Sequence, residues 1–141
     1  MASKAPRISH LLETALYVHD LEVSRAFYTQ VLGLECLGSD DRMCAFAVPG
    51  CGVLLLFRIG ASRVPSRVPG GLIPPHDGHG TMHLCFAIPV SQLDAWATHL
   101  AACGVAVESR VRQTFDGTSL YFRDPDGHSI EVATPGLWET Y

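Results

Sequence analysis

The run Leu12-Glu13-Thr14-Ala15-Leu16-Tyr17-Val18 has a counterpart about seventy residues later, Met82-His83-Leu84-Cys85-Phe86-Ala87-Ile88. An amphipathic stretch follows each run and ends at a glycine that precedes an aliphatic residue, Gly33 in the first half and Gly104 in the second. Short hydrophobic runs then complete each half. Because a repeated unit folds in the same way each time, we expect a pseudo-symmetric molecule whose halves contribute equivalent positions to one site.

Hydrophobic periodicity divides each half into one helix and four strands. The strands are expected at about 10–18, 34–38, 43–48 and 53–58 in the first half, and at about 82–88, 105–112, 118–123 and 129–133 in the second. The helices are expected at about 21–32, with Asp20 or Ser24 as N-cap, and at about 91–103, with Ser91 as N-cap. The predicted fold class is therefore α+β, with two paired βαβββ modules that form a cupped, mostly antiparallel sheet and carry their helices on the outside.

The 141 residues predict a single domain. We place module 1 at about 8–60, a connector at 61–80, module 2 at about 81–134 and a C-terminal tail at 135–141. The connector contains four prolines, several glycines and no hydrophobic periodicity. Such a segment is either a passive linker or a lid over a site.

Composition excludes several classes of partner. The net charge of −4 and the lack of Lys or Arg runs argue against nucleic acid, which requires a clustered basic surface. No apolar run reaches the roughly 18 residues of a membrane span, and the N-terminal residues contain no apolar signal core. Five cysteines without a CxxC spacing predict reduced thiols. The sequence thus predicts a cytoplasmic protein that binds neither nucleic acid nor membrane.

Strand parity gives each module an apolar face under its helix and a mixed face toward the cup. The mixed faces carry Glu13, His83 and Glu131, and the first two of these occupy equivalent positions of the repeat. Each could also have a purely structural role, as a solvated or paired carboxylate or as a hydrogen-bonded histidine. Together they predict an open divalent-metal site for Fe(II), Mn(II) or Zn(II). Glu13 and Glu131 are also the candidate catalytic bases, since either could exchange ligation for proton transfer.

Further candidates surround this set. The expected substrate pocket consists of Tyr17, Leu55, Phe57, Cys85, Ser119, Tyr121, Arg123 and Trp138. His76 and His79 are weaker candidate ligands, because histidines in a Gly/Pro-rich loop are usually exposed to solvent, and His128 is expected to point outward. A nucleophilic pair of Cys85 and His83 is disfavoured, because residues two apart on one strand face do not orient a base onto its nucleophile.

Over residues 8–134 the chain resembles the vicinal oxygen chelate superfamily, which includes glyoxalases, extradiol dioxygenases, fosfomycin-modifying enzymes and bleomycin-resistance proteins. The resemblance is carried by residues 16–21 running into 26–28 and 31–34, and by 121–128 running into 130–131. It implies that the first and last strands of the modules supply metal ligands, which fits His83 and Glu131. It also implies a homodimer in which Glu13 of one subunit meets His83 and Glu131 of the other.

The resemblance does not select one reaction. Glyoxalases carry a carboxylate ligand where this chain has Leu55, and the fosfomycin enzymes carry Thr where it has Ala15, so the sequence favours neither activity. We expect a metal-dependent enzyme of lyase, isomerase or dioxygenase type that acts on a small molecule with vicinal oxygens. The alternatives are a metal-free small-molecule binding protein of the bleomycin-resistance type and a non-catalytic interaction domain.

Overall fold

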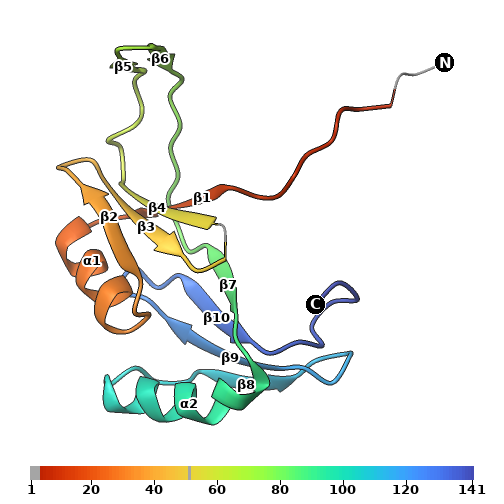
Figure 1. The fold of residues 1–141 in the computed structure, drawn as a ribbon. Coiled ribbons are helices and arrows are strands. Elements are labelled where there is room, and N and C mark those ends of the chain that lie inside the picture. The colour runs from red at the N-terminus through yellow and green to blue at the C-terminus, as the bar shows by residue number, and fades with distance from the viewer. Residues whose placement is uncertain (1–3, 51) are drawn as a thin grey trace.

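The computed structural model describes residues 4–50 and 52–141, so Cys51 lies outside the described residues. Two four-stranded sheets, each accompanied by one helix, make up the body of the molecule (Figure 1). The first contains β1 (Glu13–Val18), α1 (Leu21–Gln30), β2 (Glu35–Ser39), β3 (Met43–Val48) and β4 (Gly52–Arg58). The second contains β7 (His83–Ala87), α2 (Leu93–Ala102), β8 (Ser109–Arg112), β9 (Thr118–Arg123) and β10 (Ser129–Ala133).

The two sheets have the same topology, with strand orders β1-β4-β3-β2 and β7-β10-β9-β8. In each sheet the first strand of the module pairs in parallel with the last, and the other neighbours are antiparallel. This arrangement confirms the predicted α+β fold of two βαβββ modules. Among the described residues, no helix is long and apolar enough to cross a membrane.

The apolar strand faces predicted from parity form the core. In the first module, Leu16 and Leu54 are buried on the face that also takes Tyr28 of α1. In the second module, Phe122 and Ile130 occupy the equivalent face, and Leu100 of α2 joins the same buried cluster. Because the helices cover these faces, the opposite faces of both sheets are available to form a site.

The predicted cap of the first helix is confirmed, and that of the second is wrong. The Asp20 carboxylate accepts hydrogen bonds from two backbone amides in the first turn of α1, and Gly33 follows the helix with a φ of 67°. Ser91, in contrast, lies inside a 3₁₀ turn (Val90–Gln92) that precedes α2. The extended backbone typical of an N-cap falls on Pro89, at the start of that turn, and Gln92 then precedes α2 without a side-chain cap.

A turn in module 2 joins the two modules. The Tyr28 hydroxyl of α1 donates a hydrogen bond of 2.8 Å to Asp124, and the His19 amide donates one of 2.9 Å to Asp126. Ser24 of α1 also donates to Asp126, at 3.2 Å. The turn 124–127 thus holds the N-terminal end and the interior of α1 through the side chains of Asp124 and Asp126.

His128 is fully buried, so the expectation that it points outward is wrong. Its Nδ1 accepts a hydrogen bond of 2.9 Å from the Met82 amide, and its Nε2 lies 2.9 Å from the Tyr17 carbonyl, which can only accept. His128 has the strand parity of Ile130, which faces the core, and both ring nitrogens find backbone partners there. The imidazole therefore links β1 to the strand that begins module 2.

The connector contains a β-hairpin that periodicity did not reveal. Strands β5 (Ser66–Val68) and β6 (Gly71–Ile73) pair with each other and project away from both sheets (Figure 1). Arg63 and Asp77 form an ion pair of 2.6 Å that joins the two legs below the hairpin. Each strand of the hairpin has only three residues, which is too short for an alternating hydrophobic pattern to be recognisable.

Candidate functional site

Two of the three predicted metal ligands meet on the second sheet. β7 and β10 are adjacent, with His83 opposite Ser129 and Glu131 opposite Cys85, so the two side chains emerge on the same face. The distance from His83 Nε2 to Glu131 Oε2 is 3.3 Å. The Glu131 side chain is only 3% exposed, whereas that of His83 is 53% exposed. The carboxylate of the pair is therefore buried, and the imidazole is accessible to solvent.

The hydrogen bonds of this pair leave room for a cation. His83 Nδ1 lies 2.9 Å from the Ser129 carbonyl oxygen, so Nδ1 carries the proton of the neutral ring and Nε2 presents a lone pair. That lone pair faces a carboxylate oxygen, and two acceptors at 3.3 Å need a proton or a metal ion between them. Glu131 Oε1 is buried and has no hydrogen-bond partner among the described residues. An imidazole oriented by a backbone carbonyl beside a carboxylate with a free oxygen fits a divalent metal.

Two neighbouring side chains keep their protons at neutral pH. Burial raises the pKa of the Cys85 thiol to about 12, and the charge of Glu131 adds to this effect. Burial also raises the pKa of Tyr121, again with a contribution from the charge of Glu131. A thiol with so high a pKa is a poor nucleophile, which agrees with the argument against a Cys85–His83 pair. The Tyr121 hydroxyl is available as a hydrogen-bond donor beside the carboxylate.

Gln113 supports this face and was missed by the sequence analysis. Its amide nitrogen donates to Ser119 Oγ at 2.8 Å and to the Tyr121 hydroxyl at 3.3 Å. Gln113 continues the alternation of β8, in which Ser109 pairs with Tyr121 and Val111 with Ser119. The parity of β8 therefore identifies Gln113 as a site residue once the register with β9 is known.

The third predicted ligand, Glu13, lies on the mixed face of the first sheet. It borders a cavity of about 640 Å³ between this face and the legs of the hairpin, and Tyr17, Leu55 and Phe57 border the same cavity as expected. His76 also lines this cavity. Its Nδ1 lies 2.6 Å from the Tyr17 hydroxyl, and the centroid of its ring lies 4.5 Å from the ring centroid of Phe57. His76 is thus part of a pocket wall, a role that its Gly/Pro-rich surroundings did not suggest.

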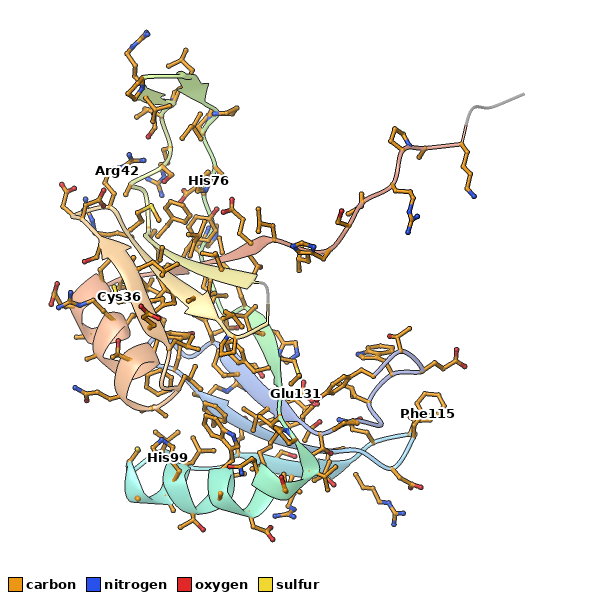
Figure 2. All side chains as sticks on the ribbon, in the orientation of Figure 1. Cys36, Arg42, His76, His99, Phe115 and Glu131 are labelled. Carbon is orange, nitrogen blue, oxygen red and sulfur yellow. The ribbon has the colours of Figure 1, made fainter. Side chains whose placement is uncertain are left out.

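A single chain does not assemble all three predicted ligands. Across residues 4–50 and 52–141, no group of three or more His, Cys, Asp or Glu side chains is placed to hold a metal ion. Figure 2 shows Arg42 and His76 at the base of the hairpin and Glu131 in the other sheet. The structure therefore places Glu13 apart from the adjacent side chains of His83 and Glu131.

The remaining predicted residues take different positions. Arg123 forms a two-point ion pair with Glu108, with nitrogen–oxygen distances of 2.6 and 3.1 Å, so its charge is already compensated. Trp138 is 68% exposed in the tail and does not line the cavity that Glu13 borders. His79 is exposed in the segment before β7.

Comparison with known proteins gives a family for this geometry. Residues 7–132 match the model of the Glyoxalase/Bleomycin resistance protein/Dioxygenase superfamily. A metallothiol transferase FosB from Bacillus licheniformis is 31% identical over 133 residues, which cover 94% of this chain and 77% of that protein. FosB from Shouchella clausii is 49% identical over 59 residues, 40% of each chain.

A solved structure shows the same fold over nearly the whole chain. The crystal structure of lactoylglutathione lyase from Agrobacterium tumefaciens has a TM-score of 0.86 and 34% identity, and it covers 95% of this chain and 99% of its own. The match of the family model over most of the sequence agrees with the paired modules. The chain belongs to the glyoxalase/bleomycin resistance protein/dioxygenase superfamily.

Proposed function

We propose that the protein is a divalent-metal-dependent enzyme that acts on a small molecule with vicinal oxygens. His83 and Glu131 would hold the metal, and Glu13 of a second copy of the chain would complete the ligand set. The observation that supports this best is the approach of His83 Nε2 and Glu131 Oε2 to 3.3 Å beside a buried carboxylate oxygen without a hydrogen-bond partner among the described residues. The described cysteines are free thiols, which supports a cytoplasmic location.

A bound divalent metal would act as a Lewis acid on the vicinal oxygens of the substrate. The residues around it would orient the substrate and move a proton. Tyr121 would donate a hydrogen bond to a substrate oxygen, because its raised pKa keeps the hydroxyl protonated and Gln113 restrains it. Glu131 Oε1 or the Glu13 carboxylate would accept a proton from the substrate. We propose this site for lyase, isomerase or dioxygenase chemistry alike.

Metal analysis tests the proposal directly. The protein would be purified without a His-tag, loaded separately with Fe(II), Mn(II) or Zn(II), dialysed and analysed by emission spectroscopy. Wild type should retain one of these metals near stoichiometrically, and His83→Ala should lose most of it, because the imidazole is a first ligand. His10→Ala removes an exposed histidine that is not a candidate ligand and serves as the matched control. If wild type retains no metal, or if both variants lose it equally, the metal site does not exist.

A metal-free binding protein remains the second candidate, and the cavity of about 640 Å³ favours it. That cavity is bordered mainly by apolar side chains, and a pocket of this size suits a drug-sized ligand. The same metal analysis separates the two functions. Tight small-molecule binding by protein that retains no metal would support sequestration in place of catalysis.

A further inference from the structure

The cavity beside the first sheet has a polar end that the proposed metal chemistry does not use. We propose that this cavity binds an elongated small molecule with an apolar body and a terminal carboxylate, and that Arg42 and Ser62 recognise the carboxylate. This proposal rests on the proposed function, because it takes Glu13 as the residue that marks the metal end of the cavity.

The walls of the cavity determine the character of the ligand body. On the sheet side they are formed by Ala15, Met43, Leu55 and Phe57. On the hairpin side four apolar residues, among them Val64, line the cavity, and Val64 is 70% exposed. An open apolar surface on a facing pair of walls favours an apolar molecule between them, since burial of such surface contributes about 25 cal/mol per Å².

The strand register places the charged ends apart. Met43 pairs with Phe57, and Phe57 pairs with Tyr17, so Arg42 lies at the level where β1 ends. Glu13 lies five residues before Val18, the last residue of β1, which corresponds to about 17 Å of strand. A ligand that approached Glu13 with its reacting oxygens would therefore present its far end to Arg42.

Arg42 is held by a hydrogen bond to the backbone and forms no salt bridge in the described part of the chain. Its Nε donates a hydrogen bond of 3.3 Å to the Ala61 carbonyl, which leaves the terminal guanidinium nitrogens available. Hydrogen bonds from the backbone, together with the Arg42 charge, lower the pKa of exposed Asp40. Within the described part of the chain, however, no carboxylate forms a salt bridge with Arg42, whereas nearby Arg63 is paired with Asp77. A neutral ligand would leave this cation without a partner in the cavity.

Ser62 supplies a second donor at the same end. It follows Ala61, the residue bonded to Arg42, and it lines the cavity. The residue is 3% exposed, and its Oγ has no hydrogen-bond partner among the described residues. A buried hydroxyl without a partner is costly unless a ligand satisfies it. A guanidinium and a hydroxyl at one end of an apolar cavity are suited to a carboxylate.

The test compares two probes that differ only in charge. 4-Phenylbutyrate and its neutral amide, 4-phenylbutanamide, would be titrated by calorimetry into protein stripped of metal by a chelator. The carboxylate should bind at least about tenfold more tightly than the amide, since a charge-assisted pair is replaced by a neutral contact. Arg42→Ala should remove this preference, Arg42→Lys should retain part of it, and Ser62→Ala should weaken carboxylate binding.

Arg67→Ala is the matched control, because Arg67 lies in β5 of the same hairpin but does not line the cavity. Equal binding of the two probes by wild type, no binding of either probe, or equal losses in Arg42→Ala and Arg67→Ala would overturn the inference. The comparison within wild type holds even if a variant fails to fold. Because the titration contains no metal, its failure leaves the His83 metal analysis unaffected, and the reverse is also true.

Discussion

At the scale of single residues, the hydrogen bond from Tyr28 to Asp124 shows how one side chain couples two modules. The Tyr28 hydroxyl is buried and donates to a carboxylate that also accepts from the backbone of its own turn. Burial raises the pKa of Tyr28 well above its ordinary value, and the charge of Asp124 raises it further. The native state therefore holds this phenol in its protonated form.

Tyr28→Phe should lower the free energy of unfolding by about 2 kcal/mol at neutral pH, because it leaves a buried carboxylate oxygen without its donor. Above about pH 10 the unfolded chain loses the phenolic proton while the native state keeps it. The native state then binds more protons, so wild-type stability falls as pH rises, and the difference from Tyr28→Phe shrinks. Urea unfolding between neutral pH and pH 11 measures this difference; curves that stay parallel would contradict the assignment.

The pair of His83 and Glu131 shows what residue patterns can and cannot predict. Parity placed His83 and Glu131 on one face, because that face depends only on alternation within each strand. The hydrogen bond of Arg42 to the Ala61 carbonyl and the ion pair of Arg123 with Glu108 were not predictable, because each depends on a partner from a distant part of the chain. The buried position of His128 follows from its parity with Ile130, because the alternation of β10 continues into the residue before the strand.

At the scale of elements, the hairpin is the part of the chain that differs most from expectation. The strands of both sheets lie within a few residues of the predicted ranges, since each alternates over four or more residues. The connector was expected to be a linker or a lid, and the lid remains a prediction. The supporting observation is that its legs and strands form one wall of the cavity that Glu13 borders.

Gly78 provides a test of how the hairpin is anchored. A Cβ at this position would lie 2.5 Å from a ring carbon of Tyr17, so Gly78→Ala should push the returning leg away from β1 and weaken the Tyr17–His76 hydrogen bond. Amide hydrogen exchange across residues 62–78 should become faster. Gly70→Ala adds the same methyl group where nothing lies within 4 Å, and it should leave exchange unchanged. Equal exchange in both variants would show that the contact does not anchor the segment.

At the scale of the whole molecule, the separation of Glu13 from the other two ligands favours a site shared between two copies. If the protein is a dimer with a shared site, mixing Glu13→Ala with His83→Ala subunits would give a heterodimer in which one cup retains Glu13, His83 and Glu131. Metal binding should recover to about half that of the wild type after subunit exchange, as measured by emission spectroscopy on the isolated heterodimer. Neither parent homodimer contains an intact cup, so both are controls. No recovery after confirmed exchange would exclude a shared site.

The links between the modules also have a consequence for the order of folding. The bonds from Tyr28 to Asp124 and from His128 to Tyr17 join residues 96 and 111 positions apart. Strands within each module pair over much shorter stretches of chain. Because closing a long loop costs more entropy than closing a short one, the modules should form separately and dock late. Mutations in the turn 124–127 should then accelerate unfolding and leave the rate of folding nearly unchanged.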